Sequence, residues 1–264
     1  MDYLVYLLVT LFGLIVGTLS GMFGIGGGAM IVPLLNLVFQ LPMLNASATS
    51  LMTIAPTSIS GSYRHLRQRT VDVPTALAFG IPGAVTSACS AILSGYLDDW
   101  IILVAAISVI SFCAFRVFKE AFKKPIDDSG RTSELRFKNP TSTLLASAAI
   151  GALAGFIAGV VGVGGGFIIV PFGIAMLGKT MKEMSAISLL AIAIISIPGI
   201  ISHALFEHIY YAYGLALIIG TIPGAMFGVW LIARVKEKAL RIAYGCVLVF
   251  SGCLLILNRL VFGG

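Results

Sequence analysis

Two glycine clusters are the residues of this sequence best suited to holding a ligand. They comprise Gly24, Gly26, Gly27 and Gly28 in the first cluster, and Gly162, Gly164, Gly165 and Gly166 in the second. Each interior glycine costs a helix about 1 kcal/mol relative to alanine, so three in a row predict a helix break. A helix that starts after such a break presents free N–H groups and about half a positive charge. Two such starts would hold an anion without a buried cation. A purely structural break is the alternative.

Polar side chains in the neighbouring apolar segments are the second set of candidates. Thr49, Thr53 and Thr57 recur at a spacing of four and therefore share one helix face. Hydroxyl groups in such positions line a polar path or bond the carbonyls of their own helix, and both alternatives stay open. Serines at positions 50 and 188 are favoured because both halves of the chain carry one there. The candidate ligands from these segments are Asn36, Ser50, Thr53 and Ser188.

Other kinds of chemistry lack the residues that they need. No Asp, Glu, Lys or Arg falls in the middle of an apolar segment, where ion-coupled pumps commonly keep a carboxylate. The sequence has no HExxH motif, no convincing Ser-His-Asp set and no metal-ligand spacing. No Gly-Lys-Ser/Thr follows either glycine cluster, which argues against a nucleotide-phosphate loop. We therefore predict no enzyme activity, no catalytic residue, no metal, no cofactor and no nucleic-acid partner.

Composition indicates that lipid surrounds these candidates. The chain has 264 residues, of which 58% are hydrophobic and 11% are charged. Soluble domains carry about 25% charged residues. A soluble core of this size would not hide so much apolar surface, so we predict an integral membrane protein with membrane lipid as its environment.

An internal repeat organises the chain. Gly13-Leu-Ile-Val-Gly17 and the stretch up to Pro33 align without gaps with the segment from Gly151 to Pro171, 138 positions later. The alignment continues downstream and, after a short insertion, pairs Ile-Pro-Gly-Ala at 81–84 with the same four residues at 222–225. We predict an N-terminal repeat over 1–118, a linker over 119–139 and a C-terminal repeat over 140–264.

Each repeat contains five apolar segments. They are expected near 3–22, 28–40, 45–62, 74–96 and 100–118, and near 142–161, 166–177, 183–204, 209–232 and 239–260. The second and seventh are too short for an ordinary span of about 20 residues, so we expect them to be broken or re-entrant. The ends of each repeat then lie on opposite sides of the membrane. The predicted fold class is all-α, with two inverted-topology repeats and 8–10 transmembrane helices.

Charge placement tests this topology. Alternating segments put all but one of the 17 basic residues on a single face. The opposite face carries Asp2, the pair Asp98-Asp99 and Glu207. By the positive-inside rule the basic face is cytoplasmic. We therefore expect both termini to be periplasmic and the linker 119–139 to be cytoplasmic, in a bacterial inner membrane.

The duplicated Gly-x-Gly-Gly-Gly followed by Val-Pro, with Ala-x-Ser-Leu downstream and Ile-Pro-Gly-Ala later in each half, resembles the TauE/SafE sulfite exporter family. The resemblance covers essentially the whole chain. It implies a secondary transporter of small sulfur-containing anions such as sulfite, sulfoacetate or thiosulfate. Export fits the missing carboxylate, with alternating access by movement of one half against the other. An anion channel and a proton-coupled importer of organosulfur compounds are the alternatives.

Overall fold

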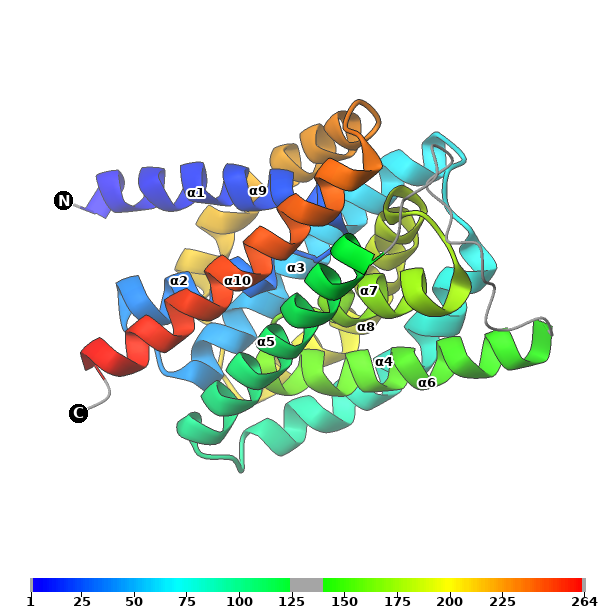
Figure 1. Cartoon of the computed structure of the whole chain (residues 1–264). Coiled ribbons are helices and arrows are strands. Elements are labelled where there is room, and N and C mark those ends of the chain that lie inside the picture. The colour runs from blue at the N-terminus through cyan, green and yellow to red at the C-terminus, as the bar shows by residue number, and fades with distance from the viewer. Residues whose placement is uncertain (1, 124–139, 263–264) are drawn as a thin grey trace.

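Ten α-helices account for every regular element in the part of the chain that the structure describes. The computed structural model describes residues 2–123 and 140–262. The helices are α1 (Asp2–Phe23), α2 (Gly28–Phe39), α3 (Met43–Arg67), α4 (Val73–Ser94), α5 (Asp99–Lys123), α6 (Pro140–Val161), α7 (Gly166–Leu177), α8 (Met181–Leu205), α9 (Tyr211–Ile232) and α10 (Glu237–Phe262). Figure 1 shows α1 and α6, the first helices of the two repeats, running in opposite directions. The predicted fold class is confirmed. Most of the predicted linker, 124–139, lies outside the described residues.

The two repeats share one register without any insertion. Every helix of the second repeat starts 138 residues after its counterpart, as Val73 and Tyr211 show for α4 and α9. The short insertion inferred from the Ile-Pro-Gly-Ala motif is therefore wrong. In the register of the structure the two copies of that motif are offset by three residues, which is about one helical turn. The shift keeps Pro82 and Pro223 on similar faces of their helices, which explains why the sequence match was misleading.

The first helix of each repeat packs against a helix of the other repeat. Helix α1 packs along α9 of the other repeat, and α6 packs along α4 in the same manner. Glycine stripes permit this approach, because a Cβ on Gly17 would lie 2.6 Å from the Cα of Thr221, and one on Gly155 would lie 2.5 Å from the Cα of Gly83. Small residues at a spacing of four let membrane helices approach closely. The glycine stripes therefore have a packing role, and the two halves of the chain do not form separate bodies.

Helices α3 and α8 form the centre of the bundle. Leu51 of α3 faces Gly199, whereas Gly61 faces Leu189, so the two helices run antiparallel. Seven helices in the described residues are long and apolar enough to cross a membrane alone. Helix α3 has 25 residues but is too polar to count among them, because of its hydroxyl side chains and its basic C-terminal end. Burial among neighbouring helices hides those hydroxyls from lipid.

Helices α2 and α7 are each 12 residues long, which corresponds to about 18 Å and half of a bilayer core. The start of α2 packs against Ile54, near the middle of α3, and α2 ends just before α3 begins. The chain therefore turns back at mid-height of the bundle. This geometry favours re-entrant segments over complete spans.

One carboxylate from each repeat accepts a hydrogen bond from the start of a central helix, at opposite faces of the bundle. Asp99, the first residue of α5, accepts a hydrogen bond from the N–H of Leu44 at the start of α3. Glu237, the first residue of α10, accepts one from the N–H of Met181 at the start of α8. An acidic group near a helix start is favourable because it meets free N–H donors and the positive end of the helix dipole. The same device thus occurs once in each repeat, on opposite faces.

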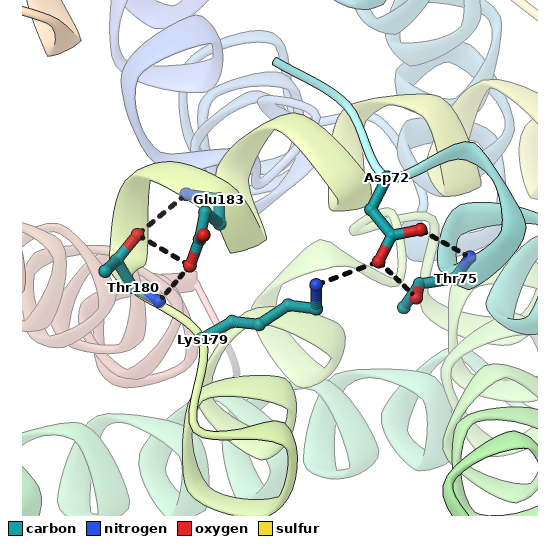
Figure 2. Close-up of polar contacts among 5 residues, drawn as sticks. All are labelled: Asp72, Thr75, Lys179, Thr180 and Glu183. Carbon is teal, nitrogen blue, oxygen red and sulfur yellow. Dashed lines mark hydrogen bonds and ion pairs between the residues drawn. The ribbon is translucent and has the colours of Figure 1, made fainter. Parts of the chain in front are cut away.

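Contacts on the basic face join loops from both repeats. Lys179, after α7, forms an ion pair with Asp72, which caps α4 (Figure 2). Lys182 donates to the carbonyl of Ala233 at the end of α9. Arg64, near the end of α3, donates to the carbonyl of Met226 in α9. These contacts place the basic residues at the end of α3 and around the α7–α8 loop on the same face of the bundle as the end of α9.

Candidate functional site

The two glycine breaks meet each other at the centre of the bundle. A Cβ on Gly28 would lie 2.6 Å from the carbonyl oxygen of Val163 in the opposite break. A Cβ on Gly166 would overlap the carbonyl oxygen of Gly24 and lie 2.9 Å from the Cα of Ile25. Because α2 and α7 both start here, two helix N-termini from inverted repeats are brought into contact. A site shared by the two helix starts, as expected from the glycine clusters, requires such a juxtaposition.

Free backbone donors line both breaks. In the described part of the chain, the N–H groups of residues 25–29 and 163–167 donate no hydrogen bond. All these residues are buried. Buried backbone N–H groups are almost always paired, and an unpaired group costs free energy comparable to a lost hydrogen bond. The two series lie in adjoining breaks and form a cradle able to serve a group that accepts hydrogen bonds, of which an oxyanion is the strongest.

Backbone conformation makes most of these glycines irreplaceable, but not in the same way in both repeats. Gly26 and Gly27 have φ values of +83° and +88°, in the left-handed region that side chains disfavour. In the second repeat Gly164 has a φ of +73°, whereas Gly165 has a helical φ of −62°. Gly165 is required for space instead, because a Cβ there would lie 2.8 Å from the Cβ of Ala154.

Two isoleucines close the breaks in this conformation. Ile54 of α3 and Ile192 of α8 both lie against Gly26, where an added Cβ would meet their Cγ2 atoms at 3.0 and 3.2 Å. Both side chains are fully buried. The structure therefore shows an occluded centre, and an anion would enter the cradle only after α3 and α8 move apart.

The polar candidates divide into bonded and unbonded hydroxyls. Ser188 donates to the carbonyl of Gly24 at 2.7 Å and so ties α8 to the first break. Thr53 donates to the carbonyl of Thr49, one turn back in its own helix. The hydroxyl of Ser50 is buried and has no hydrogen-bond partner within the described residues. Of these three groups, Ser50 alone has a hydroxyl free to reach a ligand.

Asn36 lies away from the breaks. Its Nδ2 donates to the carbonyl of Leu41 at 2.8 Å, in the connection between α2 and α3. Two turns of α2 separate it from Gly28. This bond ties the short helix to the connection that follows it.

Sequence reasoning missed Ser20. This serine is fully buried in α1, and its hydroxyl has no partner among the described residues. It lines a cavity of about 10 Å³ together with Gly27 and the first residues of α2. A space of that size suits one water molecule. The available signal was the repeat itself, because position 158 in the second copy carries alanine and the polar residue breaks the symmetry.

Comparisons with known proteins agree with this architecture. The family model described as "Sulfite exporter TauE/SafE" matches residues 9–255. The probable membrane transporter protein YunE of Bacillus subtilis is 29% identical, with 95% of this chain and 97% of the relative covered. The probable membrane transporter protein MJ0441 of Methanocaldococcus jannaschii is 27% identical, with 95% of each chain covered.

No solved structure matches the chain. The family match spans nearly all of the sequence, and the relatives are named as membrane transporters rather than as enzymes. The described part of the fold adds seven helices that are long and apolar enough to cross a membrane. The chain is therefore a multi-pass membrane transporter, and it belongs to the sulfite exporter TauE/SafE family.

Proposed function

We propose that this chain exports small sulfur-containing anions, such as sulfite, sulfoacetate or thiosulfate, across a bacterial inner membrane by alternating access. The observation that carries the proposal is the meeting of two helix breaks whose N–H donors lack partners. A helix start contributes at most about 2 kcal/mol to an anion, so two starts give modest affinity and allow release. Sulfite, which the family description names, would present several acceptor oxygens to such a cradle.

The interlocked packing defines which parts move. Helices α1, α3 and α9 pack together, and α4, α6 and α8 form the equivalent set. Each set draws helices from both repeats, so we propose that these mixed units move against one another, rather than the two halves of the chain. The contact between α3 and α8 is their shared boundary. Separating Ile54 from Ile192 at that boundary would expose the cradle to one face at a time.

Export of an anion needs no coupling ion. An inside-negative potential favours the outward movement of one negative charge by about 2.3 kcal/mol per 100 mV. A channel would share the cradle but open both gates together. Flux measurements distinguish the transporter from the channel. The purified chain is reconstituted in proteoliposomes with sulfite, thiosulfate, sulfoacetate or sulfate. Saturable flux with counterflow supports a transporter, whereas non-saturating flux without counterflow supports a channel.

Two glycine substitutions test the cradle. Gly27→Ala forces a side chain into a left-handed conformation, and Gly165→Ala forces a Cβ against Ala154. We expect both variants to lose most of the flux while remaining folded in detergent. Wild-type flux in both variants would exclude the breaks as the binding site. A proton-coupled importer would instead show uptake that follows an imposed pH gradient.

Orientation in the membrane is tested by labelling. We propose that the basic face and the linker 119–139 are cytoplasmic and that both termini are periplasmic. Arg69 lies exposed after α3, and Tyr96 lies exposed after α4 on the opposite face. In a background without the four cysteines, an impermeant thiol reagent added to intact cells should label Tyr96→Cys and spare Arg69→Cys. The reverse pattern would invert the topology.

A further inference from the structure

A cavity on the basic face has no part in the central site. It has a volume of about 280 Å³ and is lined by Tyr63, Arg64, Arg67, Gln68 and Met226. These residues come from the last turns of α3, from Gln68 directly after it and from α9. A cavity of this size holds many water molecules and has room for a charged headgroup.

The cavity opens on the outer surface of the helix bundle. Tyr63 is 58% exposed, and Ile59 and Leu66 are exposed on the same face of α3. Beside them on α9, Met226, Phe227 and Trp230 are exposed as well. In a membrane protein such a surface faces lipid, and aromatic side chains gather where the bilayer meets water. The cavity therefore lies at the headgroup level, with an apolar surface leading away from it.

The charges in the cavity are positive and uncompensated by any carboxylate in the described residues. One guanidinium nitrogen of Arg64 donates to the carbonyl of Met226 at 2.9 Å, which holds the side chain in place. A guanidinium has five N–H donors, so others remain for a ligand. Arg67 is exposed and makes no ion pair with a described residue. Two guanidinium groups, one of them fixed, suit the oxygens of a phosphate.

We propose that this cavity binds the headgroup of an anionic phospholipid, with the phosphate on Arg64 and Arg67. The acyl chains would lie along the exposed apolar surface of α3 and α9, where Tyr63 and Met226 begin it. Basic pockets at the cytoplasmic ends of membrane helices are suited to anionic headgroups. A soluble anion would gain nothing from this apolar surface, which is why the geometry favours lipid. The proposal does not depend on the identity of the transported substrate.

The test measures lipid binding to the purified full chain in detergent by native mass spectrometry. Phosphatidylglycerol should bind at least several-fold more tightly than phosphatidylcholine. Arg67→Gln should weaken phosphatidylglycerol binding about fivefold, and the double substitution with Arg64→Gln about 25-fold, because each arginine near a charged surface contributes a factor of that size. Arg69→Gln is the matched control, since Arg69 lies two residues after Arg67 but does not line the cavity. It should bind lipid almost as the wild type does.

Three outcomes would overturn the proposal. Equal binding of the two lipids would exclude recognition of the anionic headgroup. Equal weakening by Arg67→Gln and Arg69→Gln would assign the effect to overall charge rather than to this cavity. Displacement of phosphatidylglycerol by millimolar inorganic phosphate would show that the cavity takes a soluble anion. Because Arg64→Gln also removes the bond to Met226, the Arg67→Gln variant decides the result if the double variant fails to fold.

Discussion

The Nζ atom of Lys179 lies 2.8 Å from the Oδ2 atom of Asp72, and this ion pair ties the loop before α8 to the start of α4 (Figure 2). The positions equivalent by the repeat are Leu41 and Tyr210, which carry no opposite charges. The tie therefore exists on the basic face alone. The tie joins α4 to the chain that enters α8, two helices of the same packed set, so it holds that set together rather than the contact between the two sets.

Replacing Asp72 separates its two roles. Asp72 also accepts a hydrogen bond from the N–H of Thr75 and so caps α4. Asp72→Asn keeps a good capping residue and removes the ion pair, and both pair members are partly exposed. We expect the free energy of unfolding to fall by less than about 1 kcal/mol. Asp72→Ala should cost about 1 kcal/mol more because the cap is lost as well. Equal losses in the two variants, measured by denaturant unfolding in detergent, would contradict this division.

The same carboxylate predicts a pH dependence. Burial raises the pKa of Asp72, but hydrogen bonds from Lys179 and Thr75 outweigh burial and hold that pKa below its usual range. A carboxyl with a depressed pKa in the folded state stabilises the fold above the pKa of the unfolded chain, about 3.9. That contribution is lost as pH falls through the lower, folded pKa. The difference in melting temperature between wild type and Asp72→Asn should stay constant from pH 7 to 5 and shrink below about pH 4. A difference that vanishes near pH 6 would contradict the assignment.

Close helix packing predicts a sharp contrast between two glycines. Gly17→Ala places a methyl group against the backbone of Thr221, which no rotamer change relieves. We expect a loss of about 1–3 kcal/mol in stability, as for other overpacked sites. Gly95→Ala is the control, because the nearest atoms lie 3.5 Å or more from its Cβ. Thermal unfolding of the two variants in one detergent measures the contrast, and equal melting temperatures would show that α1 and α9 can separate freely.

Much of this fold was predictable from the sequence, because residues that recur at the same position in both repeats have the same structural role in each. A glycine cluster at the same place in each repeat located both helix breaks. Helix pairing between repeats was not predictable in the same way. A glycine stripe indicates that a helix is approached closely, but it does not indicate which helix approaches.

The occluded centre was also hidden from sequence reasoning. Ile54 and Ile192 are apolar residues in apolar helices, and nothing in their type marks them as the side chains that fill the space beside Gly26. Thr53 was ambiguous for a related reason, since its hydroxyl suits a ligand and its own helix equally well, and the structure shows it bonded to the carbonyl of Thr49. Only the fold decides such cases, because the choice depends on which atoms lie nearby.

Ser20 offers a direct test of whether the two breaks contribute equally to binding. Its unpartnered hydroxyl lies beside Gly27, whereas the equivalent residue in the second repeat is Ala158. If an anion binds at the first helix break, beside Gly27, Ser20→Ala removes one hydrogen bond to a charged ligand. Such a bond is worth about 1.5–3 kcal/mol. We expect the KM for efflux to rise about tenfold or more, with little change in melting temperature. Ala158→Ser, the reciprocal change, should leave the KM of the wild type almost unchanged if the first repeat dominates. A KM unaffected by Ser20→Ala would show that the substrate binds without this hydroxyl, and a lowered KM in Ala158→Ser would show that both breaks hold it.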